Sequence, residues 1–150
     1  MIRGIAGVIV GYVVMAVVMF LTFSLAYLGM GTNRAFKFGS FDPSLFWIVI
    51  SFFLGFVAAL VGGYTCATIA KSKRAAQVFA GLVFVIGIIV AIPVLTSADP
   101  RPNVRMGDVP NIEAMTKART PGWVALMNPL IGAVGVMVGA GLRQARASRD

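Results

Sequence analysis

The chain has 150 residues, of which 59% are hydrophobic and only 12% are charged, and its formal net charge is +8. Soluble domains are about 45–50% apolar and about 25% charged; a soluble globule with this excess would display apolar patches that monomers rarely expose, and a disordered chain would carry far less apolar material. The composition therefore excludes both classes and predicts an integral membrane protein, and the positive charge suits anionic lipid headgroups or an acidic partner.

Four long uncharged segments predict four membrane-spanning helices, because a spanning helix needs about 20 mostly apolar residues. The first segment is too long for a signal peptide, whose apolar core covers about 7–15 residues. We expect one all-α membrane domain over residues 1–150, built as a four-transmembrane-helix bundle with antiparallel up-down-up-down order. The predicted spans cover residues 4–30, 44–70, 77–97 and 121–142.

The first two connections carry signals for helix ends. Gly31 is a candidate C-cap for the first span, since glycine adopts the left-handed conformation without strain. Asp42 or Ser44 is a candidate N-cap for the second span. Residues 71–76 make a very short link, so the second and third spans should form a tight antiparallel hairpin.

The third connection, residues 98–120, is the only sizeable segment outside the predicted spans. Its prolines favour an extended start. Residues 111–119 predict a short surface helix, with Asn111 as its N-cap and Glu113 placed to pair with Lys117 one turn later.

Lysine and arginine are denser on the side of the membrane that holds both termini and the second connection. The positive-inside rule therefore predicts a multi-pass protein with both termini in the cytoplasm, in a bacterial inner membrane. These basic residues either only set the topology or also bind anionic lipid headgroups. The candidates for headgroup binding are Lys71, Lys73, Arg74, Arg143 and Arg146, with Arg3 and Arg149 on the same side.

Small residues spaced four apart recur in the spans and predict close helix packing. Lipid tails are as apolar as leucine, so tight contact across small residues is what pairs membrane helices. Such a stripe either packs inside one bundle or faces a membrane-protein partner or a second copy of the chain. The residues concerned are Gly7, Gly11, Gly55, Ala59, Gly63, Gly135 and Gly139.

Uncharged polar residues collect in the half of the spans nearer the third connection: Ser24, Tyr27, Ser51, Thr96 and Asn128. Pro129 follows Asn128 and frees a backbone carbonyl one turn earlier. These groups predict either a small pocket that opens outward under residues 98–120, or hydrogen bonds between helices. Since none of them ionises near neutral pH, proton coupling through them is not expected.

Missing residue types exclude several chemistries. The chain has no histidine, so histidine-ligated haem, histidine zinc sites and histidine bases are excluded. Its single cysteine, Cys66, cannot form an internal disulfide. Asp99, Asp108 and Glu113 do not match the spacing of a calcium loop. We therefore expect no cofactor, no metal site, no catalytic group and no nucleic-acid partner.

Two functional classes fit this pattern. The first is a small accessory or structural subunit that packs against a larger membrane complex. The second is a small oligomeric transporter or channel with an uncharged polar pocket. Proton-driven transporters keep an acid or base within the membrane, and the predicted spans contain none. The sequence therefore favours the accessory subunit.

Overall fold

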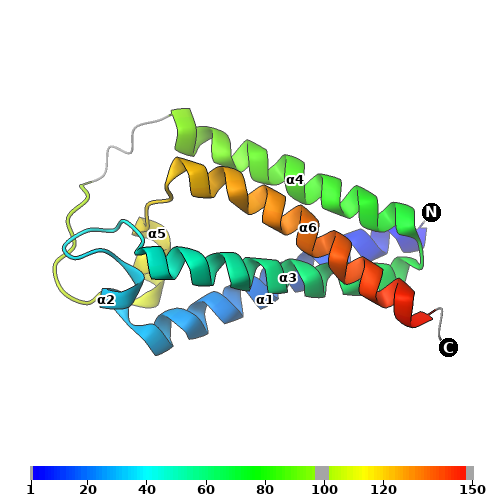
Figure 1. The fold of residues 1–150 in the computed structure, drawn as a ribbon, viewed down its shortest axis with the longest axis horizontal. Helices are drawn as coiled ribbons and strands as arrows, with labels where there is room; N and C mark the ends of the chain where they lie inside the picture. Colours follow the sequence, from blue (N-terminus) through cyan, green and yellow to red (C-terminus); the bar gives the residue numbers. More distant parts are fainter. Residues whose placement is uncertain (1, 97–101, 148–150) are drawn as a thin grey trace.

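A computed structural model of the chain describes residues 2–96 and 102–147. It confirms the all-α bundle of four antiparallel spans, each long and apolar enough to cross a membrane (Figure 1). A short helix between the third and fourth spans is confirmed as well. The spans are α1 (Ile2–Met30), α3 (Leu45–Ala70), α4 (Lys73–Thr96) and α6 (Gly122–Ala147), and the short helices are α2 (Thr32–Ala35) and α5 (Asn111–Lys117).

Three helices extend beyond the predicted spans, and α1 does so by only two residues, since it begins at Ile2. α4 begins at Lys73, where hydropathy placed the start at residue 77, and α6 continues to Ala147, past residue 142. Hydropathy marks the part of a helix that lies in lipid, whereas lysine, arginine and alanine continue a helix readily beyond it. The predicted last residue of the third span, Ser97, lies outside the described residues.

The helix ends follow the predicted signals. Gly31 ends α1 with a φ of 77°, a conformation that glycine adopts without strain. Ser44 is the N-cap of α3, because its side chain accepts a hydrogen bond from the backbone nitrogen of Trp47 at 3.0 Å. Lys71 takes the left-handed conformation after α3, and its N–H donates to the carbonyl of Ala67. α4 begins two residues later, so the tight hairpin is confirmed.

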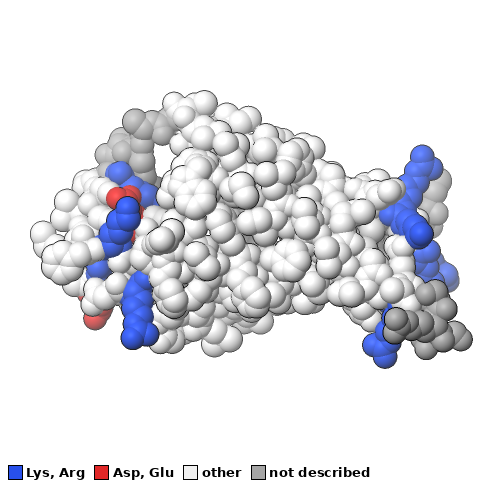
Figure 2. All heavy atoms as spheres, viewed as in Figure 1, with Lys and Arg blue, Asp and Glu red and all other residues white. Residues whose placement is uncertain are grey.

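The charged residues define two ends of the molecule. Residues 31–44 and 102–121 form what we call the loop end, and the opposite end, which carries Arg3, Lys71 and Arg143, is the basic end. Figure 2 shows lysine and arginine at both ends and an uncharged belt between them. Such a belt is the surface that a bilayer requires of a multi-pass protein.

α3 lies at the centre of the bundle, packed against α1 on one side and α6 on the other, and α4 packs mainly on α6. α1 and α4 make little contact with each other. They approach at the basic end and diverge toward the loop end (Figure 1). The bundle is therefore wedge-shaped, with its open side between α1 and α4.

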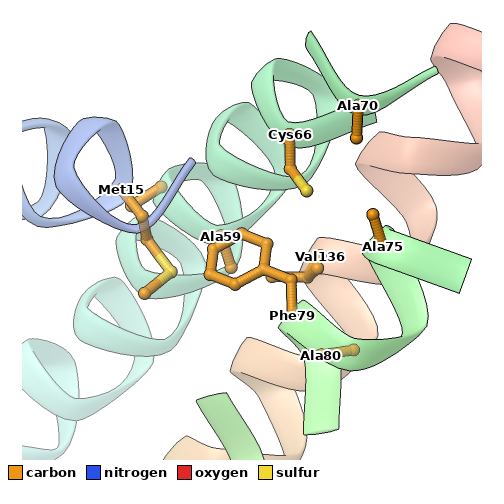
Figure 3. Close-up of a cluster of buried hydrophobic side chains, with 9 residues drawn as sticks. Met15, Ala59, Cys66, Ala70, Ala75, Phe79, Ala80 and Val136 are labelled. Atoms are coloured by element: carbon orange, nitrogen blue, oxygen red, sulfur yellow. The ribbon is translucent and has the colours of Figure 1, made fainter. Parts of the chain in front are cut away.

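Small residues bring the backbones into contact where the helices cross. A Cβ on Gly11 would lie 2.9 Å from the Cβ of Cys66, so α1 and α3 are in close contact here. A Cβ on Gly63 would collide with the carbonyl of Val136, and this contact joins α3 to α6. Phe79 of α4 is fully buried and fills the space beside these crossings (Figure 3). Close backbone contact, with one large side chain between the helices, therefore forms the core.

Candidate functional site

Tyr27, one of the predicted polar residues, holds the loop end together. Its hydroxyl is 2.7 Å from the carbonyl oxygen of Val109, to which it donates, and 2.9 Å from the hydroxyl of Thr32. The backbone N–H of Val109 donates to the same Thr32 hydroxyl at 3.2 Å. Tyr27 and Thr32 are both buried. The third connection is thus fixed to the end of α1 at Val109.

Arg105 is a buried cation inside the loop end, with 6% of its surface exposed. Its guanidinium donates to the carbonyls of Ser40 and Gly107 and to the side-chain oxygen of Asn33. These dipoles replace water around the charge, as a buried charge requires. Sequence reasoning missed this residue, because its acceptors come from two connections that only the fold brings together.

Ser24, a second predicted polar residue, contacts α5. The side-chain amide of Asn111 donates to the Ser24 hydroxyl at 3.0 Å. The prediction that Asn111 caps α5 is wrong: Pro110 is the N-cap, and Asn111 begins the helix. The predicted pair within α5 does form, with the Lys117 ammonium 2.8 Å from the Glu113 carboxylate. Its partly exposed surroundings make it a modest contribution to stability.

Thr96 does not join the other polar residues. Its hydroxyl is exposed and donates to the carbonyl of Ile92 in its own helix at 2.9 Å. This back-bond satisfies the hydroxyl within α4. The five residues predicted at one depth therefore separate: Ser24 and Tyr27 bind the loop end, and Thr96 bonds to its own helix.

Ser51 and Asn128 do come together. Both line a cavity of about 460 Å³ on the open side of the wedge, between α1 and α4, over a floor of α3 and α6. Thr120 also lines it and was missed, since it precedes the fourth span. In the part of the chain that the structure describes, none of these three side chains has a hydrogen-bond partner. The cavity thus combines apolar walls with three free uncharged polar groups.

Pro129 leaves one backbone carbonyl at this cavity without a hydrogen-bond donor. Pro129 lies inside α6 and has no N–H, so the carbonyl of Ala125 lacks its usual helical donor. Both residues line the cavity. The Pro129 ring packs against Gly87 of α4, where a Cβ would lie 2.7 Å from the ring. This contact lets the proline-containing part of α6 approach α4 closely.

The residues of the predicted packing stripes have two different surroundings. Gly7 and Gly11 contact α3, and Ala59, Gly63, Gly135 and Gly139 lie at the crossing of α3 and α6. Gly55 differs, because nothing lies within 4 Å of where its Cβ would stand. It lines the cavity one turn from Ser51. Six of the seven residues therefore pack inside the bundle, and Gly55 faces open space.

The predicted headgroup residues lie on three elements at the basic end. Lys71 follows α3, Lys73 and Arg74 begin α4, and Arg143 and Arg146 lie in the last turns of α6. The described acids all lie at the opposite, loop end (Figure 2). Among the described residues, the positive charge at the basic end therefore has no acid beside it.

Comparisons with protein-family models, with curated proteins and with solved structures give no match to this chain.

Proposed function

We propose that this four-span membrane protein is an accessory subunit, and that the cavity between α1 and α4 receives a transmembrane helix of a larger membrane complex. One observation carries the proposal: the bundle leaves its α1–α4 side open and places unpaired polar groups there. Every other long interface, α1 with α3, α3 with α6 and α4 with α6, is closed within the chain.

The free polar groups favour a partner that can form hydrogen bonds. Lipid tails offer no donors or acceptors, so the Ser51 hydroxyl and the Asn128 amide stay unsatisfied against hydrocarbon. A polar side chain on a partner helix would satisfy them at about 0.6 kcal/mol per bond, up to about 1.7 kcal/mol. Gly55 would let that helix approach α3 closely, since it leaves space on the same face.

A substitution that fills the cavity tests this proposal. Gly55→Leu adds a side chain where nothing lies within 4 Å, so the bundle should still fold. Gly81→Leu is the matched control, because nothing lies within 4 Å there either and Gly81 lines none of the described cavities. Each variant is purified from native membranes in a mild detergent, its mass is measured, and its companions are identified.

Three outcomes are informative. A larger subunit that accompanies the wild type and Gly81→Leu in stoichiometric amount, and is lost from Gly55→Leu, supports the proposal. A wild-type chain that purifies alone contradicts it, as does a companion that Gly55→Leu retains in full.

The cavity itself favours the second candidate, a small transporter or binding protein for an uncharged molecule. Its volume of about 460 Å³ lies within the range of small-molecule sites, about 300–1,000 Å³. It ends toward the basic end where the buried Phe79 packs near Gly11, so a pocket fits better than a continuous pore. Uptake by sealed vesicles that Asn128→Leu abolishes, with folding intact, would favour this candidate.

A further inference from the structure

A second groove lies between α1 and α4, at the basic end. Its volume is about 770 Å³. Arg3 of α1 and Arg74 of α4 stand at its mouth. Its walls continue along Ile5 and Ile9 on α1 and along Val78 and Leu82 on α4. The groove therefore changes from cationic to apolar along its length.

The two arginines are free to bind an anion. Both are exposed, and neither has a hydrogen-bond or ion-pair partner among residues 2–96 and 102–147. The first turns of α1 and α4 lie at the same mouth, where the positive ends of the helix dipoles favour negative charge. A guanidinium binds phosphate oxygens through two parallel N–H groups, so two arginines can hold one phosphate from both sides.

The apolar walls match a hydrocarbon chain. Ile5, Ile9, Val78 and Leu82 are all exposed. A helix rises about 9 Å from Arg3 to Ile9, so the walls lie in the hydrocarbon when the arginines lie at the headgroups. Gly4 and Ala75 also line the groove, and a Cβ on Gly4 would lie 3.9 Å from the Cβ of Ala75.

We propose that this groove binds one anionic phospholipid. Arg3 and Arg74 hold its phosphate, with the Ser72 hydroxyl as a further donor at the mouth. One acyl chain lies between α1 and α4 against the four apolar residues. The site is separate from the cavity at Ser51 and Asn128, and it requires no partner protein. It differs from diffuse attraction to a charged surface because it has a fixed stoichiometry and depends on the apolar walls.

The experiment uses the full chain in a neutral detergent and counts bound lipid by native mass spectrometry. Phosphatidylglycerol and phosphatidylcholine with the same acyl chains are compared. We expect one phosphatidylglycerol retained per chain and no retained phosphatidylcholine. The double variant Arg3→Gln/Arg74→Gln should weaken phosphatidylglycerol binding about thirty-fold, since each exposed guanidinium in direct contact with the phosphate contributes about five-fold.

Two controls separate this site from other sources of affinity. Arg143→Gln/Arg146→Gln removes the same charge at the same end but outside the groove. It should change binding less than about three-fold, because salt and solvent screen an exposed charge that does not touch the phosphate. Val78→Trp fills the groove without changing charge and should also weaken binding, whereas Val85→Trp on the lipid-facing side of α4 should not. Circular dichroism and gel filtration verify that each variant is folded.

Several results would overturn the proposal. Equal losses of phosphatidylglycerol binding in the two double variants would show that general surface charge holds the lipid. Unchanged binding by Val78→Trp, or displacement of the lipid by equimolar glycerol 3-phosphate, would show a phosphate site without an acyl-chain groove. Equal retention of the two lipids would contradict selection of an anionic headgroup, because phosphatidylcholine carries the same phosphate with a compensating positive charge.

Discussion

The hydroxyl of Tyr27, in the last turn of α1, donates a 2.7 Å hydrogen bond to the carbonyl oxygen of Val109, 82 residues later in the chain. This bond fastens the third connection to the first span, and Thr32 takes part through its own hydroxyl. The loop end is therefore held by specific hydrogen bonds, and it positions α5 over α1. Its order depends on a few polar contacts, which makes each of them testable.

Tyr27→Phe should loosen the loop end while the spans stay intact. The variant loses the 2.7 Å bond to the Val109 carbonyl, which keeps only a 3.4 Å bond from the Thr32 hydroxyl. One such lost bond costs about 0.5–1.5 kcal/mol. Hydrogen exchange should become faster around Val109 and unchanged in the middle of α3. Tyr12→Phe is the control, because Tyr12 is half-exposed and makes no described side-chain hydrogen bond. Equal exchange in the two variants would contradict the role of Tyr27.

Arg105→Met should destabilise the same region more strongly. The side chain donates to three acceptors in a buried site, and hydrogen bonds of charged groups contribute about 1.5–3 kcal/mol each. Limited proteolysis should cut residues 102–110 in the variant before it cuts them in the wild type. Lys37→Met, at an exposed position, should leave the cleavage rate unchanged; a similar rise there would attribute the effect to charge alone.

Gly63→Ala should destabilise the whole bundle. The new Cβ would collide with the backbone of Val136, which cannot move without displacing α6. Overpacking of this kind costs about 1–3 kcal/mol. A lower thermal midpoint in detergent, and less folded protein, are the expected readouts. Gly55→Ala adds the same methyl group into open space and should melt like the wild type. A normal midpoint for Gly63→Ala would contradict the described crossing of α3 and α6.

Asn128→Leu should weaken binding in the cavity without lowering the stability of the fold. Asn128 is exposed and unpaired in the described part of the chain, so its loss removes no internal hydrogen bond. The thermal midpoint should stay within a few degrees, while association with a partner or a ligand in the cavity falls. A large loss of folded protein would show that Asn128 holds helices together.

The spans and their caps could be predicted because they depend on local sequence. Apolar runs fix the helices, and Gly31 and Ser44 act on their immediate neighbours. The pairing of the helices could not be predicted, since small residues such as Gly11 and Gly63 are compatible with several partners. The structure shows that Gly11 contacts α3 and Gly63 contacts α6. It also shows that Gly62, which is not among the predicted packing residues, contacts Gly11 and Met15.

The candidate site was predicted only in part, because depth in the membrane does not specify direction around a helix. Ser24 and Asn128 were expected in one cluster, but Ser24 faces α5 and Asn128 faces the cavity. No sequence pattern around Arg105 indicates that its side chain is buried. Two of its three side-chain acceptors, Ser40 and Asn33, lie 65 and 72 residues away in the sequence.

Photocrosslinking from the wall of the cavity tests the central claim most directly. Val90 lines the cavity and is 65% exposed, and its neighbour Ile89 does not line it and is 59% exposed. A photoreactive residue is placed at each position in native membranes. We predict a discrete protein adduct from position 90 and none from position 89. Only lipid adducts at position 90, or the same protein adduct from both positions, would contradict a partner helix in the cavity.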